Sequence, residues 1–272
     1  MIIDIDSATD SRLDAFRWRD RQLASKLDRL DAVGAGLFIA EGDLVVQRAI
    51  DMHYHAVSLL CDKATGAALS TLVDSTVNIF IASEDIRGEV TGLGVPLRAT
   101  GLFRRPPLVD PHTLLSSAQR VVIAEDIDNP TNLGAIVRSA AALGWDGIVL
   151  APGSADPLAR RALRVSMGSG LSMPFTRLSP HDNVNELLQH HGFMTVALTP
   201  DPTAINVSDI SYTSQQKIAL MFGSERDGLH ADTLSASSAI ARIPMHGGID
   251  SLNVGAAAAI AMYALGPDNA DQ

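Results

Sequence analysis

Three glycine-rich segments of this 272-residue chain carry polar side chains whose types and spacing could do chemistry. The first runs from Asn132 to Arg138, the second from Phe222 to Gly228, and the third from Ile243 to Gly255. Glycine lets a ligand approach the backbone closely. Each segment sets glycine beside amide, carboxylate, hydroxyl or guanidinium groups, which together could bind and orient a polar ligand.

In the first segment, Asn132 can cap a helix, and Arg138 lies nearly two turns further along, so the two side chains could share a face. In the second, Glu225 can cap or orient a neighbouring group. In the third, Ser251 and Asn253 could both point into a site. Simpler alternatives stay open on spacing alone: a surface helix with an ordinary arginine, a strand-to-loop turn with a solvated acid, and a tightly packed core helix.

Alternating strands and helices must position these segments. Near-continuous apolar strands, such as those at 120–124, 147–150 and 218–222, favour a mainly parallel sheet that is buried on both faces. Further strands are predicted at 174–177, 193–198 and 240–243, with helices at 132–143, 157–168, 182–190, 230–238 and 253–265. Ligands in such sheets bind at the carboxyl ends of the strands, where all three segments fall.

A smaller α/β domain is predicted ahead of this one. It starts with an amphipathic helix over 10–31, followed by strands at 37–40, 56–61, 78–82 and 99–103 and helices at 43–53, 66–73 and 84–90. Three prolines between Arg104 and Pro111 mark the boundary. The predicted organisation is a domain over 1–105, a Pro-rich linker over 106–112 and a second domain over 113–268.

Composition limits the function classes. The net charge of −10 counts against a general nucleic-acid binder, although 18 of the 21 basic residues are arginine, which suits local phosphate contacts. The acidic start of the chain is unlike a secretory signal, and the apolar run over 252–266 is too short for a membrane span. We therefore expect a cytoplasmic protein with no membrane partner.

No metal site is expected. The single Cys61 excludes a four-thiolate zinc site. His53 and His55 have no third ligand nearby in the sequence, and His190 and His191 at a helix end favour interaction with the helix dipole.

The three segments, in this order and spacing, resemble the signature motifs of the SpoU/TrmH group of SPOUT-class RNA ribose methyltransferases. The resemblance is strong from about Val121 to Leu265 and weaker over 32–105, which is similar to a small substrate-binding domain. One departure is Gly255, where the family usually has serine. The resemblance implies an α/β catalytic domain whose C-terminal chain makes a deep trefoil knot, and a homodimer formed through the helices of motifs one and three.

The resemblance also implies site residues. The catalytic candidates are Arg138, Asn132, Glu225, Ser251 and Asn253. The candidates for binding S-adenosylmethionine, and S-adenosylhomocysteine as product, are Leu198, Thr199, Phe222, Gly223, Ser224, Gly228, Ile243, Met245, Ser251, Leu252 and Asn253. The RNA-binding candidates are Arg138, Arg164, Arg104 and Arg105.

The implied reaction is methyl transfer to a ribose 2′-hydroxyl, in rRNA more than in tRNA because of the separate N-terminal domain. A guanidinium stays protonated, so we expect Arg138 to anchor a neighbouring phosphate and stabilise developing alkoxide charge, while a phosphate oxygen or water accepts the proton. The alternatives are a tRNA ribose methyltransferase, a methyltransferase acting on a base nitrogen, and a non-catalytic RNA-binding protein with the same fold.

Overall fold

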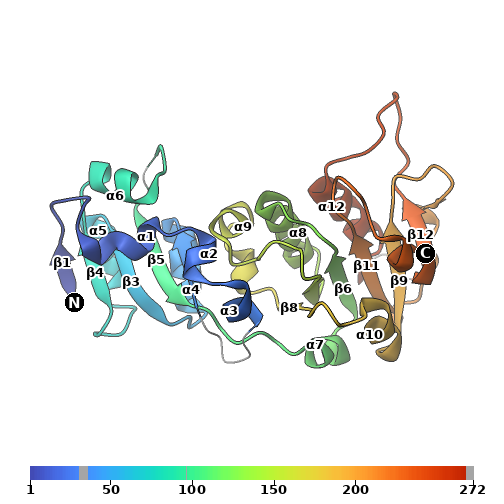
Figure 1. Ribbon diagram of the computed structural model, residues 1–272, viewed down its shortest axis with the longest axis horizontal. Coiled ribbons are helices and arrows are strands. Elements are labelled where there is room, and N and C mark those ends of the chain that lie inside the picture. Colours follow the sequence, from blue (N-terminus) through green and yellow to red (C-terminus); the bar gives the residue numbers. More distant parts are fainter. Residues whose placement is uncertain (31–35, 96, 268–272) are drawn as a thin grey trace. The chain divides into compact units, whose positions relative to one another are not determined.

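The computed structural model describes residues 1–30, 36–95 and 97–267 (Figure 1). The chain divides into two compact units. The first comprises Met1–Leu108 together with Leu158–Leu171, and the second comprises Val109–Pro157 together with Ser172–Gln272. Within the described residues, no helix is long and apolar enough to cross a membrane.

The first unit is built on a mixed five-stranded sheet in the order β1-β4-β3-β5-β2. Its strands are β1 (Ile2–Asp4), β2 (Leu37–Glu41), β3 (Ala56–Cys61), β4 (Asn78–Ile81) and β5 (Ala99–Arg104). Its α-helices are α1 (Asp14–Arg17), α2 (Asp20–Leu23), α3 (Lys26–Leu30), α4 (Asp43–Asp51), α5 (Lys63–Leu69), α6 (Glu84–Thr91) and α9 (Arg160–Val165). The β1–β4 and β4–β3 pairs are parallel, whereas β5 is antiparallel to both β3 and β2.

The predicted continuous helix over 10–31 is wrong. The structure has a 3₁₀ turn at Ser11–Leu13 and then the three short helices α1, α2 and α3. The backbone is extended at Arg19 and at Ala24, which breaks the helical path twice. Ser25 and Asp28 then exchange side-chain to backbone hydrogen bonds of 2.8 and 3.1 Å that start α3. The predicted end of the helix at residue 31 lies outside the described residues.

The second unit contains a seven-stranded, entirely parallel sheet in the order β10-β12-β9-β11-β6-β7-β8. Its strands are β6 (Arg120–Ala124), β7 (Gly147–Leu150), β8 (Phe175–Arg177), β9 (Phe193–Leu198), β10 (Ile205–Asn206), β11 (Lys217–Phe222) and β12 (Ala239–Arg242). Its α-helices are α7 (Pro111–Ser117), α8 (Pro130–Ala142), α10 (Val184–His190), α11 (Ala231–Ala236) and α12 (Val254–Ala264). The expected α/β architecture with a mainly parallel sheet is confirmed, and β10 and α7 are elements that were not predicted.

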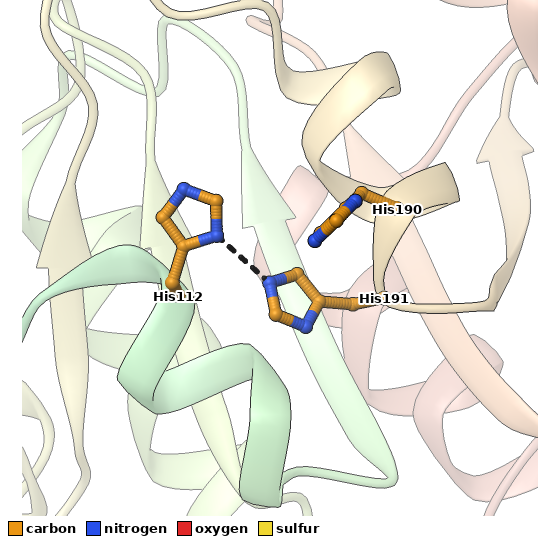
Figure 2. Close-up of side chains that lie close together, drawn as sticks. All are labelled: His112, His190 and His191. Atoms are coloured by element: carbon orange, nitrogen blue, oxygen red, sulfur yellow. Dashed lines mark hydrogen bonds between the residues drawn. The ribbon is translucent and has the colours of Figure 1, made fainter.

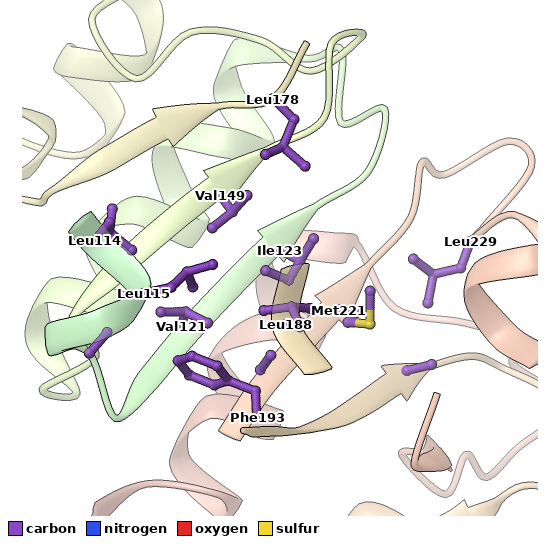
Figure 3. Packing of buried hydrophobic residues seen from close by; sticks show 13 residues of the cluster. Leu114, Leu115, Val121, Ile123, Val149, Leu178, Leu188, Phe193, Met221 and Leu229 are labelled. Atoms are coloured by element: carbon purple, nitrogen blue, oxygen red, sulfur yellow. The ribbon is translucent and has the colours of Figure 1, made fainter. Parts of the chain in front are cut away.

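Helices cover both faces of the parallel sheet. On one face, Leu115 of α7 and Leu188 of α10 pack with Val121, Ile123 and Met221 in a buried apolar cluster (Figure 3). Side chains alternate between the faces of a strand. The intervening residues Val122, Ile148 and Leu220 are also fully buried. On this second face of the sheet, α12 contacts β11 and packs along α8. The buried apolar strand sequences are therefore explained by cover on both sides.

The segment Leu158–Leu171 belongs to the first unit, although it lies between β7 and β8 in the chain. Its helix α9 contacts β2. Tyr54 donates a 2.9 Å hydrogen bond to the Leu171 carbonyl. The boundary between Leu108 and Val109 falls within the predicted linker over 106–112. The predicted domains differ from the two units in one respect, because Leu158–Leu171, which was assigned to the second domain, completes the first unit. The predicted end of the second domain, residue 268, lies outside the described residues.

Candidate functional site

A cavity of about 380 Å³ lies at the carboxyl ends of β9, β11 and β12, in the second unit. This volume is in the range of small-molecule sites. Ten of the eleven residues predicted to bind a cofactor line it: Leu198, Thr199, Phe222, Gly223, Ser224, Gly228, Ile243, Met245, Ser251 and Leu252. Glu225, predicted as catalytic, lines it as well, whereas Asn253 does not.

Sequence reasoning missed several lining residues. They are Pro200, Arg226, Asp227, Leu229, Leu234, Asp250, Val254 and Ala257. Arg226 and Asp227 lie inside the second glycine-rich segment, so closer attention to that loop could have found them. Leu234 and Ala257 lie on helices, where an apolar side chain carries no signal that separates a cavity wall from the core.

The fold of the loop after β11 requires glycine at position 223. The loop after β11 folds back on itself, with a bridge between Ser224 and Gly228 and a 3.0 Å hydrogen bond from the Gly228 amide to the Ser224 carbonyl. A Cβ on Gly223 would lie 2.0 Å from the Gly228 carbonyl carbon. Glycine here therefore closes the loop that forms one wall of the cavity, rather than only admitting a ligand.

One relay of hydrogen bonds joins all three glycine-rich segments. The Asn132 side-chain amide donates to Glu225 Oε1, and the Asn253 amide donates to Asn132 Oδ1 over 3.0 Å. Asn253 Oδ1 in turn accepts from the Gly255 amide over 3.0 Å and caps α12. Residues more than ninety positions apart in the chain thus hold one another in fixed orientations beside the cavity.

A buried carboxylate, which sequence reasoning did not select, supports the same loop. Glu125 follows β6 and is 5% exposed. It accepts hydrogen bonds from the His230 backbone amide at 2.6 Å and from the Thr233 hydroxyl at 2.5 Å. Because His230 and Thr233 begin α11, Glu125 fixes the end of the loop that starts at Gly223. The contact was not foreseeable from the sequence, since its members lie more than a hundred residues apart.

The charges around the cavity are mostly negative. Glu225, Asp227 and Asp250 line it, together with one cation, Arg226. Arg226 lies 2.9 Å from Asp128 in an exposed ion pair. Opposite charges attract more strongly in a partly enclosed site than in bulk water, so this lining favours a ligand that carries positive charge.

Arg138 lies apart from the cavity lining. It is exposed on α8 and makes no hydrogen bond or ion pair with the residues that the structure describes. At 3.6 residues per turn, six positions rotate a side chain to about 120° from the starting direction. The expectation that Arg138 and Asn132 share one face is therefore wrong: Asn132 is buried toward Glu225 and Asn253, and Arg138 faces outward.

The other arginine candidates lie in the first unit. Arg164 forms a 2.6 Å ion pair with Glu41, whose side chain is 1% exposed. Arg105 is 7% exposed, whereas Arg104, the last residue of β5, is exposed. Of these three candidates only Arg104 is exposed, since Arg105 is buried and the Arg164 guanidinium is already paired with an acid.

Comparison with known proteins gives the site a context. The model of the SpoU rRNA Methylase family matches residues 119–263, which span the parallel sheet and all three glycine-rich segments. A protein of Mycobacterium bovis described as an uncharacterized tRNA/rRNA methyltransferase is 37% identical over 266 residues, which cover 96% of this chain and 90% of that protein.

Two further relatives have more specific names. The Bacillus subtilis 23S rRNA (guanosine(2553)-2'-O)-methyltransferase RlmP is 27% identical over 228 residues, 84% of this chain and 88% of that protein. A crystal structure of an AdoMet-bound rRNA methyltransferase from Sinorhizobium meliloti superposes with a TM-score of 0.80 at 25% identity and covers 97% of both chains. The similarity to that structure extends over both units of the fold.

Proposed function

Because the chain belongs to the SpoU rRNA methylase family, and is therefore an RNA methyltransferase, we propose that it methylates a ribose 2′-hydroxyl of rRNA with S-adenosylmethionine. The observation that carries the proposal is the relay from Glu225 through Asn132 to Asn253 at the edge of the cavity. It joins the motif residues of all three segments into one site. The name of the Bacillus subtilis relative supports the ribose hydroxyl and rRNA as targets.

The cavity residues fit S-adenosylmethionine. Three carboxylates and one guanidinium among the lining residues favour a cationic ligand, and the apolar side chains of Leu198, Ile243 and Leu252 offer surface to an adenosine group. When bound, S-adenosylmethionine supplies an electrophilic methyl group on its sulfonium. The loop of Gly223, Ser224 and Gly228 would hold it through backbone groups, and S-adenosylhomocysteine would be the product.

The polar residues of the relay would orient the target ribose. Asn132 and Asn253 each form hydrogen bonds through both the nitrogen and the oxygen of the side-chain amide, so the orientation of each amide group is fixed. Ser251 lines the cavity and is exposed, so its hydroxyl can reach a substrate. Positioning a hydroxyl in line with the bond that breaks is itself a large part of catalysis.

Arg138 would act on the RNA backbone. Its guanidinium stays protonated and can form paired hydrogen bonds with a phosphate, and it would stabilise negative charge that develops on the ribose oxygen. A phosphate oxygen or a water molecule would accept the proton. Since Arg138 faces away from the cavity of its own chain, we propose that a homodimer formed through α8 and α12 brings Arg138 of one copy to the cavity of the other.

Exposed apolar residues support such a dimer. Ile260 and Tyr263 are 44% and 65% exposed on α12, which packs along α8. Two-fold dimers bury the same patch of both copies. We also propose the deep trefoil knot that the fold class implies for the C-terminal chain.

The first test is transfer of labelled methyl from S-adenosylmethionine to total RNA from a strain that lacks this protein. Label in rRNA that survives alkali as a dinucleotide is expected, because 2′-O-methylation blocks cleavage at that position. Label in tRNA alone, or in alkali-sensitive nucleotides, would redirect the proposal to another RNA or to a base nitrogen. No label, despite binding of the methyl donor, would favour a non-catalytic RNA-binding protein.

The second test asks whether two copies share a site. Arg138→Ala and Asn253→Ala are each expected to lower kcat by at least about 100-fold. When the two inactive variants are mixed and allowed to exchange subunits, one of the two sites in each mixed dimer would have both residues intact. Recovery toward about a quarter of the wild-type activity, as random exchange predicts, supports the shared site. No recovery despite proven exchange would place Arg138 at its own chain's cavity or outside catalysis.

A further inference from the structure

Three histidines from two helices gather at one place in the second unit. His112 is the second residue of α7, His190 is the last residue of α10, and His191 caps the end of α10. The three rings turn toward one another (Figure 2). His112 and His191 are 79 positions apart in the sequence, so the cluster is invisible to any reading of local spacing.

The ring nitrogens are close enough to share one ion. One nitrogen from each ring can be chosen so that all three lie within 4.8 Å of one another. His112 Nδ1 and His191 Nε2 are 3.0 Å apart and share a hydrogen bond. Zinc–nitrogen bonds of about 2.0–2.1 Å in a tetrahedron place ligand nitrogens about 3.3 Å apart. One pair is within about 0.3 Å of this spacing, and the third nitrogen needs a shift of about 1.5 Å or less, which exposed side chains can make by small rotations.

We propose that His112, His190 and His191 form a binding site for Zn²⁺ or another first-row divalent metal that prefers imidazole. Three neutral imidazoles leave a fourth position to water or to a carboxylate. Oxygen-seeking ions such as Mg²⁺ are excluded by the ligand type. The metal would take the place of the proton that His112 and His191 now share.

The charges around the cluster come from two further residues. The pKa of His191 is lowered. The largest cause is desolvation by burial, followed by the neighbouring rings of His190 and His112 and the ammonium of Lys217. Lys217 opposes a cation, but its Nζ donates to the Leu115 and Ser116 carbonyls at 2.9 and 3.3 Å and so points along the backbone of α7. Asp110 caps α7 through Thr113 and offers a carboxylate on the same side, which partly offsets the lysine.

The site would be structural. It joins the start of α7 to the end of α10, the two helices whose leucines cover one face of the parallel sheet. His191 precedes β9, and the cavity residues Leu198 and Thr199 lie at the other end of that strand. A strand of six residues spans about 20 Å. A bound metal would therefore fix helix packing without contacting the methyl-transfer site.

The test uses the full chain without a polyhistidine tag. Titration with ZnCl₂ is followed by calorimetry, and CoCl₂ is added separately because a Co²⁺ absorption spectrum reports a tetrahedral site with nitrogen ligands. We expect one equivalent of Zn²⁺ to bind with a Kd of about 1 µM or lower, and a rise in Tm of about 5 °C at saturation. Mg²⁺ at the same concentration should produce neither effect.

Substitutions locate the site. His112→Asn and His191→Gln are each expected to weaken Zn²⁺ binding at least about tenfold and to abolish the rise in Tm. His181→Ala is the matched control, an exposed histidine of the same unit outside the cluster, and should bind as the wild type does. Absence of binding by the wild type at about 100 µM Zn²⁺, or equal binding by all three variants, would overturn the proposal.

Affinity for S-adenosylhomocysteine separates a structural role from a catalytic one. It should be unchanged by Zn²⁺ and by His112→Asn. A change of tenfold or more would overturn the structural assignment.

Discussion

The two units place their carboxylates differently. In the first, Arg164 and Arg160 both approach the buried carboxylate of Glu41, at 2.6 and 3.5 Å, and Arg160 also donates to the Phe16 carbonyl. In the second, Glu125 is buried and holds a loop, but three further carboxylates line the cavity: Glu225, Asp227 and Asp250. Charge in the first unit holds an insertion in place, whereas the second unit also presents charge to a cavity.

Sheet topology accounts for the cavity of the second unit. There every strand runs in the same direction, so the loops that follow β6, β9, β11 and β12 leave the sheet at one edge and meet there. In the first unit four strands also share one direction and only β5 runs against them. The carboxyl end of β2, however, is occupied by the insertion, because Glu41 at that end pairs with Arg160 and Arg164.

The largest expected effect is on the cavity. Gly223→Ala should lower affinity for S-adenosylhomocysteine by at least about 100-fold, because the new Cβ would collide with the Gly228 backbone and open the loop. Calorimetry measures the affinity, and circular dichroism checks that the fold persists. Gly94→Ala, at a position with open space around it, is the control. Normal affinity in Gly223→Ala would mean that the closed loop is not needed for binding.

The next largest effect is expected from removing the buried charge that pairs with two arginines in the first unit. Glu41→Gln should lower the free energy of unfolding of that unit by about 2 kcal/mol, since two arginines lose their buried carboxylate but keep some contact with water. Cys61 gives the measurement: it is buried in β3, and burial raises the pKa of its thiol to about 12, so it reacts only when the unit opens.

Alkylation of Cys61 should therefore be about 30-fold faster in Glu41→Gln than in the wild type. Glu89→Gln removes an exposed acid of α6 in the same unit and should leave the rate almost unchanged. Equal rates in all three proteins would show that the ion pairs of Glu41 do not hold the first unit together.

A smaller effect is expected from the buried acid of the second unit. Glu125→Gln should cost about 1.5 kcal/mol, because the glutamine oxygen can accept only one of the two hydrogen bonds from the His230 amide and the Thr233 hydroxyl, and the amide nitrogen cannot accept the other. Chemical denaturation in a Trp18→Phe background measures this through the fluorescence of Trp145, which is buried in the same unit. Asp128→Asn breaks an exposed pair with Arg226 and should cost much less; similar losses in both would refute the role of burial.

The smallest effect concerns Gly255, where family members usually have serine. A Cβ there would lie 2.9 Å from the Ala135 Cβ of α8, so Gly255→Ser should force a small shift between the helices and cost about 1 kcal/mol in the same denaturation experiment. Ala256→Ser, one residue further on and exposed, is the control. A gain in stability would show that the two helices separate freely enough to admit the serine.

Elements whose evidence was local were predicted well. The strands at 120–124, 147–150 and 193–198 match β6, β7 and β9 in full, because unbroken apolar runs between polar loops have few other interpretations. The helix over 10–31 failed because helical spacing of apolar residues does not reveal backbone breaks, which side-chain hydrogen bonds such as that of Ser25 produce.

For the candidate site, sequence motifs identified most of the cavity wall but not its internal connections. The three glycine-rich segments contain residues such as Ser224 and Met245 that line the cavity. Helical spacing sets Asn132 and Arg138 about 120° apart, but it did not show which of the two faces Glu225. The acid Glu125 was passed over because its partners come from an element a hundred residues later.

The sequence by itself determined the α/β class, the mainly parallel sheet of the second domain and most of the segments that end beside the cavity, because these follow from apolar patterns and glycine positions within short windows. Tertiary structure alone decided that Arg164 is held by Glu41, that Glu225, Asn132 and Asn253 form one relay, and that His112 meets His191. The physical reason is that such contacts depend on how strands far apart in the chain are ordered in a sheet, and no local pattern encodes that order.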